Sequence, residues 1–145
     1  MIRLTHAAAL ALMLVAGPTI AQTSGQIFKA PNKYRSTASP VEGADIQVFP
    51  FQGSSGRDYF CAAADYAIRY LGARTTDRLI IVVPEMPRAG PTEPKSVHFA
   101  LASRSDAPDL PGGQGAIDPR RVGENRNVGA SHHFCFRSRG KKNNR

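Results

Sequence analysis

The sequence has no tryptophan and only two cysteines among its 145 residues. Two cysteines are too few for a disulfide-dense miniprotein, and 13 glycines are too few for a collagen. Because 41% of the residues are hydrophobic and 21% are charged, the composition is that of a soluble globular chain. It does not fit a coiled coil or a multi-pass membrane protein. The length allows one domain with one modest core.

Residues 1–21 have the pattern of a secretory signal peptide. Arg3 precedes the apolar run Ala7–Ala16, and a small-residue cleavage site ends at Ala21. This run is shorter than the ~20 residues that a membrane-spanning helix needs, and we find no later apolar run that could span. We therefore expect cleavage after Ala21 and a mature chain without a transmembrane span that starts at Gln22. We expect that chain in the periplasm or outside the cell.

Positive charge is concentrated at the C-terminal end of the chain. Lys and Arg exceed Asp and Glu by 19 to 11, and from Asp118 onward by eight to two. The last cations are Arg137, Arg139, Lys141, Lys142 and Arg145. We expect residues 138–145 to be a basic tail that binds an anionic envelope surface by charge. The alternative is that the tail only keeps the protein in solution. Because we expect export, we expect no nucleic-acid partner.

An amphipathic helix is the clearest predicted element. Its apolar positions repeat at spacings of three and four residues, at Cys61, Ala64, Ile68 and Leu71. This pattern predicts a helix over Tyr59–Leu71, with Asp58 as its N-cap and Gly72 as its stop. Asp65 and Arg69 are expected on the opposite side, one turn apart.

The remaining pattern predicts an α+β domain over residues 44–137. Strands are expected at 45–49, 78–83, 96–102 and 131–136. The first ends at Pro50 and suits a sheet edge, whereas the second is apolar throughout and suits a central strand covered on both faces. We expect an extended leader over 22–43 and a long connection over 106–127. The predicted fold is one helix on a small, mostly antiparallel sheet of about four strands, with one disulfide.

The two cysteines predict that disulfide. Cys61 is expected in the first turn of the helix and Cys135 in the last strand. An even number of cysteines in an exported chain favours a bridge, and two cysteines allow only one pairing. If Cys135 faces the helix, then Phe134 and Phe136 face away from it. They are either covered by another segment, which we favour, or exposed as a binding surface.

The alternative function is that of a cysteine hydrolase. A thiol at a helix N-terminus has a lowered pKa, and His98 on a later strand is the natural base. This arrangement resembles the papain-like cell-wall amidases and peptidases, although the sequence lacks the Gly-Asp step and the Gly-His pair expected before these strands. The resemblance implies hydrolysis of cell-wall peptide or amide bonds by Cys61 and His98.

The sequence has no pattern typical of a metal site, a phosphate-binding loop or a glycosidase active site. His132 and His133 are adjacent, so on a strand they point to opposite faces and cannot share a metal. No Gly-Lys-Ser/Thr step follows the glycines near residue 53. Asp58 and Asp65 lie two helical turns apart, without a tryptophan for sugar stacking. We therefore expect no metal and no cofactor.

The helical segment resembles a group of small exported bacterial proteins without an assigned activity. In that group an aromatic-Cys-x-Ala-x-(Asp/Glu)-Tyr-Ala helix recurs, as in Phe60–Ala67, and strands like Arg78–Val82 and Ser96–Phe99 follow it. The similarity spans about Asp45 to Phe136. It implies an envelope protein and carries over no catalytic residue. The leading hypothesis is therefore a small exported, non-enzymatic domain with a binding or structural role in the envelope.

Overall fold

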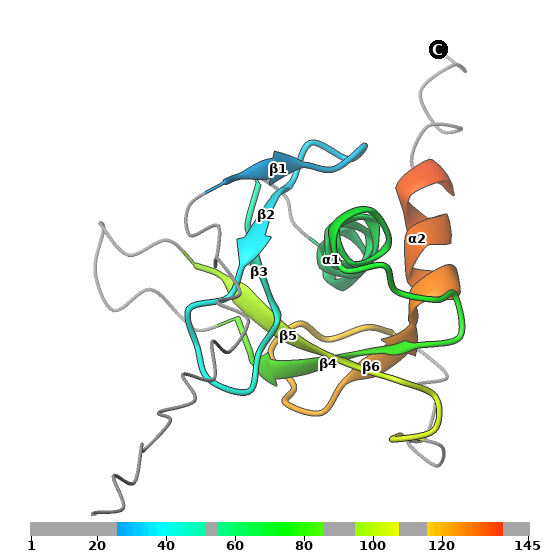
Figure 1. Ribbon diagram of the computed structural model, residues 1–145. Helices are drawn as coiled ribbons and strands as arrows, with labels where there is room; N and C mark the ends of the chain where they lie inside the picture. Colours follow the sequence, from blue (N-terminus) through cyan, green and yellow to red (C-terminus); the bar gives the residue numbers. More distant parts are fainter. Residues whose placement is uncertain (1–25, 52–54, 86–94, 108–115, 138–145) are drawn as a thin grey trace, which may run out of the picture.

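The computed structural model describes residues 26–51, 55–85, 95–107 and 116–137 (Figure 1). The expected signal peptide and basic tail lie outside these residues. The elements in chain order are β1 (Phe28–Lys29), β2 (Arg35–Ala38), β3 (Ile46–Phe49), α1 (Gly56–Tyr70), β4 (Arg78–Val83), β5 (Val97–Ala102), β6 (Asn125–Asn127) and α2 (Val128–Arg137).

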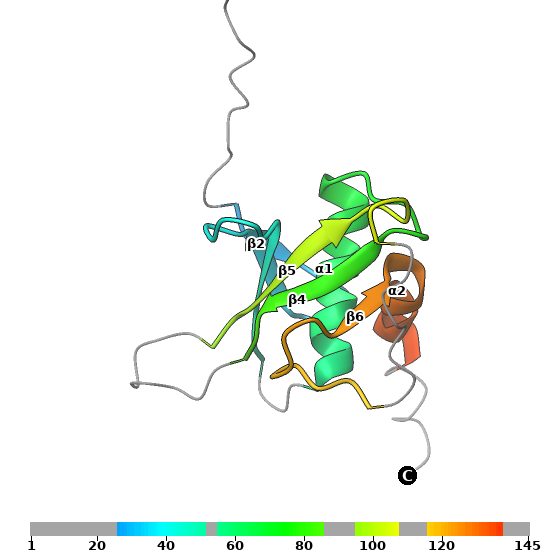
Figure 2. The same cartoon turned by 90° about the horizontal axis from the view of Figure 1, so that it is seen from below.

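The strands form one antiparallel sheet in the order β1-β2-β3-β5-β4-β6. Figure 1 shows this sheet curving around α1, with α2 on the side of α1 that the sheet leaves open. Figure 2 shows β6 running directly into α2. The predicted α+β class with one disulfide is confirmed. The expected count of about four strands is wrong, because β1, β2 and β6 also join the sheet.

Two of the additional strands lie in the range expected to be an extended leader. β2 pairs with β3 along its whole length, from Arg35 opposite Phe49 to Ala38 opposite Ile46. Its polar composition conceals one buried position, Ser36, whose hydroxyl donates to the Ala62 carbonyl of α1 at 3.3 Å. As a result β3 is an interior strand and not the edge strand that Pro50 indicated.

The helix α1 confirms the predicted helix and extends it at the N-terminus. Every residue from Tyr59 to Ala67 is buried and Leu71 is 41% exposed, so the expected one-sided apolar pattern is wrong. Ser55 is its N-cap, and Asp58 occupies the third helical position and accepts from the Ser55 N–H at 3.0 Å. Asp58 is therefore part of a capping box and not the N-cap itself. The earlier start places Cys61 in the second turn. Gly72, with φ +66°, follows the C-cap in the left-handed conformation that ends the helix.

The core lies between α1 and the concave face of the sheet. Alternate strand residues are fully buried there: Ile46, Val48, Leu79, Ile81, Val97 and Phe99. The Phe99 ring contacts the Phe60 ring of α1 edge-on, with centroids 5.0 Å apart. In β4 the intervening residues Ile80 and Val82 are only half-buried. The expectation that β4 is equally covered on both faces is therefore wrong, because α1 packs on one face of the sheet.

The segment expected to be the last strand, 131–136, is part of the helix α2. The Oδ1 atom of Asn127 accepts from the Ala130 N–H at 2.7 Å, which caps the first turn. The buried residues Val128, Ser131 and Cys135 are spaced by three and four and form one helical face against α1. The alternation of Phe134 and Phe136 imitates a strand over a stretch too short to distinguish the two periods.

Candidate functional site

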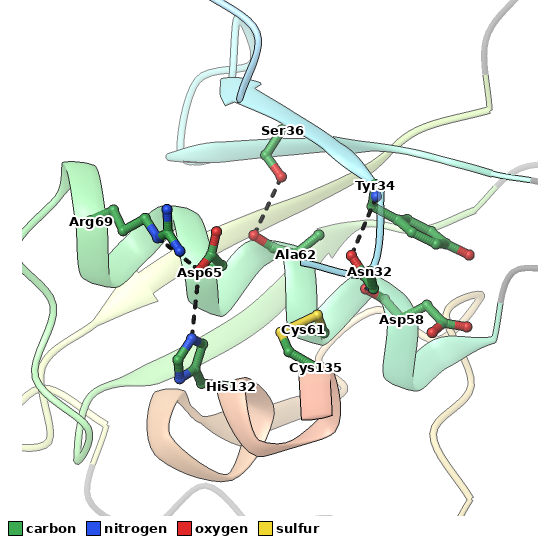
Figure 3. Close-up of a disulfide and its surroundings, with 10 residues drawn as sticks. All are labelled: Asn32, Tyr34, Ser36, Asp58, Cys61, Ala62, Asp65, Arg69, His132 and Cys135. Carbon is green, nitrogen blue, oxygen red and sulfur yellow. Dashed lines mark hydrogen bonds and ion pairs between the residues drawn. A yellow bond between two sulfur atoms is a disulfide. The ribbon is translucent and has the colours of Figure 1, made fainter. Parts of the chain in front are cut away.

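The disulfide between Cys61 and Cys135 joins the two helices (Figure 3). It spans 74 residues of sequence, its Cα atoms are 5.1 Å apart, and the two cysteines are only 1% and 2% exposed. The predicted bridge is confirmed, but it connects helix to helix and not helix to strand. A soluble reductant reaches these sulfur atoms only after the helices separate. The bond is therefore placed to hold the fold together and not to exchange with other thiols.

The two phenylalanines beside Cys135 lie in different surroundings because they are on a helix. Residues two apart on a helix point in nearly opposite directions. Phe134 packs against the core and has the Arg57 guanidinium 5.7 Å from its ring centroid. Phe136 is 49% exposed and contacts His132 edge-on. We expected the two rings to be either both covered or both exposed. In the structure Phe134 is covered and Phe136 is exposed.

Asp65 is a buried carboxylate next to the disulfide. It is only 4% exposed because α2 covers this side of α1. Asp65 lies one turn after Cys61 and shares its side of the helix, so the expectation that it lies on the opposite side is wrong. Its Oδ1 atom lies 2.9 Å from Arg69 Nε and 3.5 Å from His132 Nε2, so α1 and α2 both contribute a partner (Figure 3). The predicted Asp65–Arg69 pair is present. The disulfide and the contact between Asp65 and His132 thus both lie between α1 and α2.

His98 lies on the convex face of the sheet, away from α1. Its strand neighbours Val97 and Phe99 point into the core, so the imidazole points outward, yet the residue is only 6% exposed. Its Nδ1 atom is 2.8 Å from Ser39 Oγ and its Nε2 atom is 3.1 Å from Ser96 Oγ. Ser39 Oγ also accepts from the Val41 N–H at 3.1 Å.

These contacts suit a neutral imidazole. A neutral ring has one donor and one acceptor nitrogen. A Ser39 hydroxyl that accepts from Val41 can donate to Nδ1, and Nε2–H can then donate to Ser96. Burial lowers the pKa of the His98 imidazole below its usual range, which also favours the neutral form. The arrangement ties three separate segments of the convex face together.

The lowered pKa of His98 predicts a loss of stability in acid. Below the unfolded pKa of about 6.5, the unfolded chain binds a proton that the native state does not, so stability falls as the pH drops. His98→Gln keeps a donor and an acceptor but removes this titration. We expect the melting temperature to fall more between about pH 7.5 and about pH 5 in the wild type than in His98→Gln. An equal fall in both proteins would show that His98 does not contribute.

Acidic and basic side chains form ion pairs within residues 118–126 of the basic C-terminal part of the chain. Arg126 Nη1 lies 3.2 Å from Glu124 Oε1, and both side chains are nearly buried, at 10% and 6% exposed. Arg120 pairs with Asp118 at 3.1 Å. The pKa of the Asp118 carboxyl is lowered first by the hydrogen bond that the Arg120 backbone N–H donates to it at 3.0 Å, and then by the Arg120 side chain. Both acidic residues after Ile117 are thus paired with cations. Glu124 Oε2 also lies 3.6 Å from Arg121 Nη1. From Arg137 onward the sequence has five cations and no acidic residue.

The structure does not bring the two residues of the hydrolase hypothesis together. Cys61 is bonded to Cys135 on the α2 side of α1, whereas His98 lies on the convex face of the sheet. A nucleophilic thiolate at Cys61 would require reduction of a buried bond. His132 lies beside Asp65, and within the described ranges no group of three His, Cys, Asp or Glu side chains could hold a metal ion.

The Ser39 partner of His98 could not be predicted from the sequence, because it lies 59 residues away along the chain. No helix in the described part of the chain combines the length and the apolar character needed to cross a membrane. Comparison with protein-family models, curated proteins and solved structures finds no match to this chain.

Proposed function

We propose that this chain is a small exported, non-enzymatic domain that binds an anionic surface of the cell envelope through its basic C-terminal tail. The observation that carries the proposal is the buried Cys61–Cys135 disulfide. A bridge of this kind persists in an oxidising compartment such as the periplasm or the outside of the cell. It also occupies the one sulfur that the hydrolase hypothesis needs as a nucleophile.

The charge distribution supports the choice of partner. Glu124 and Asp118 are paired with arginines of the folded domain and do not neutralise the residues that follow Arg137. The tail cations Arg139, Lys141, Lys142 and Arg145 have no acidic residue among them. Segments 138–145 contain no apolar side chain, so the tail associates by charge and not by insertion.

Deleting residues 140–145 should weaken binding to anionic vesicles by about 100-fold at low salt, because each of the three cations removed contributes about 1 kcal/mol. The melting temperature should not change, since the deletion begins after Cys135 and removes only polar and charged residues and one glycine. Binding is measured by sedimentation with vesicles of phosphatidylglycerol and phosphatidylcholine in equal amounts. The effect should shrink as salt is added, because the Debye length at physiological salt is only ~8 Å.

The control tests whether binding depends on where the cations lie or only on how many there are. Lys141→Gln with Lys142→Gln removes two tail cations, and Arg74→Gln with Arg104→Gln removes two exposed cations from turns of the domain. We expect the first pair to weaken binding and the second pair to leave it nearly unchanged. Equal binding by the truncated and full-length proteins would instead show that the tail only aids solubility.

A further inference from the structure

The β1–β2 hairpin carries three exposed cations, Lys29, Lys33 and Arg35, and residues 26–41 include no acid. None of these cations forms an ion pair with an acidic residue in the part of the chain that the structure describes. The sequence pattern did not single out this segment, because its net charge is small compared with that of the C-terminal tail.

The strand register places two of these charges side by side. Lys29 lies directly opposite Arg35, and Arg35 lies directly opposite Phe49 of β3. Directly opposed residues share a face of the sheet and have Cβ atoms about 5 Å apart, so two like charges here repel each other. The Arg35 guanidinium lies 5.6 Å from the Phe49 ring centroid, which holds it over the sheet. An anion between the two cations would relieve the repulsion.

The hairpin is anchored firmly to α1, so the backbone positions that carry these cations are fixed. The Phe28 ring packs on Tyr66 and Tyr70 near the end of the helix, with centroid distances of 5.4 and 3.5 Å. At the turn, Asn32 Nδ2 donates to the Asp58 carbonyl at 2.9 Å. Lys33 follows with φ +71°, a left-handed conformation that closes the tight turn. A backbone that is already fixed loses little conformational entropy when the hairpin binds.

Exposed apolar side chains lie on either side of the three hairpin cations. Ile27, one residue before β1, is 52% exposed, and Phe51, two residues after β3, is 55% exposed. Phe51 lies near the hairpin turn, where its ring is 6.3 Å from that of Tyr34. A soluble anionic polymer offers no apolar region in which such side chains could be buried. A bilayer can bury them at the level of its headgroups.

We propose that the hairpin surface of Ile27, Lys29, Lys33, Arg35 and Phe51 docks on an anionic phospholipid bilayer. The cations contact lipid phosphates, and the two apolar side chains enter the headgroup region. This inference rests on the proposed function in one respect, because it requires an anionic envelope surface as the partner. It adds a second, structured contact that acts independently of the tail and identifies the surface as lipid.

The test compares vesicle binding by four forms of the exported full chain with the same N-terminus. They are the wild type, Lys29→Gln with Arg35→Gln, the Arg74→Gln and Arg104→Gln control, and the deletion of 140–145. On vesicles of phosphatidylglycerol and phosphatidylcholine in equal amounts, we expect the hairpin variant to bind roughly 30-fold more weakly at low salt. The control should bind like the wild type, and all four should keep the same melting temperature within a few degrees.

The outcomes separate this inference from the proposed function. A loss in the hairpin variant without a loss on tail deletion supports the docking surface and overturns the role of the tail. A loss on tail deletion alone overturns the docking surface and leaves the tail proposal intact. Equal losses in the hairpin variant and the control overturn the docking surface, because net charge then accounts for both.

A further variant tests the assignment to lipid. Ile27→Ser should weaken binding to the vesicles but not to inorganic polyphosphate, which has the charge and lacks the hydrocarbon. If wild-type protein binds polyphosphate and not the vesicles, or if Ile27→Ser weakens neither, the bilayer is not the partner of the hairpin.

Discussion

Replacing Cys135 with serine should lower the free energy of unfolding by about 4 to 5 kcal/mol. The bridge closes a loop of about 75 residues, and opening it restores that much conformational entropy to the unfolded chain in the loop-entropy description. The loss is comparable to the whole stability of many small domains, about 5 to 15 kcal/mol. The variant should therefore have a much lower melting temperature, measured by circular dichroism without reductant.

Cys61→Ser together with Cys135→Ser is the matched control. Either single replacement opens the same loop, so the double variant should melt at nearly the same temperature as Cys135→Ser. Reductant should destabilise the wild type toward the same value and leave the double variant unchanged. If the single and double variants melt like the wild type, the sulfur atoms are not bonded and the pairing of α1 with α2 is in error.

Replacing Phe60 with alanine should cost about 3 to 5 kcal/mol, the usual loss when a fully buried phenylalanine is truncated. Phe60 is 0% exposed and its ring meets Phe99 edge-on, so truncation leaves a cavity between α1 and β5. Denaturant unfolding followed by far-ultraviolet circular dichroism gives the change. The midpoint should fall with little change in slope.

Phe136→Ala provides the comparison, because it removes the same atoms from a residue that is 49% exposed. We expect it to change stability by no more than about 0.5 kcal/mol, as is usual for surface positions. If Phe136→Ala costs as much as Phe60→Ala, the Phe136 ring is buried. The placement of α2 along α1 would then be wrong.

The elements that could be predicted from sequence are those whose signal is local and long. α1 repeats its apolar positions over four turns, and β4 and β5 each contain six residues of β-branched or alternating apolar character. The disulfide could be predicted because two cysteines have one possible pairing. Together with the alternating segment 45–49, which forms β3, these features predict the helix α1, three of the six strands of the described sheet and the disulfide.

The missed elements are short or polar. β1 and β2 have two and four residues, and only Ser36 shows that β2 has a buried face. In α2, the alternation of Phe134 and Phe136 concealed the helical spacing of its buried positions. Asn127 was the available signal, since an asparagine before a small, apolar run is a typical N-cap.

The error at Asp65 has a local cause. Asp65 follows Cys61 by four residues, so it lies on the Cys61 side of α1, which α2 covers. The contact of His98 with Ser39 could not be predicted, because Ser39 is brought to it by the pairing of β2, β3 and β5. Tertiary contacts of this kind leave no periodic trace in one sequence.

The most direct test of an exported, disulfide-held domain is the intact mass of the exported protein before and after reduction under denaturing conditions. We expect the unreduced species to have the mass of residues 22–145 less two hydrogen atoms, and to gain those two atoms on reduction. A species that retains Met1 and stays in the membrane fraction, or a mass that does not change on reduction, would contradict this conclusion.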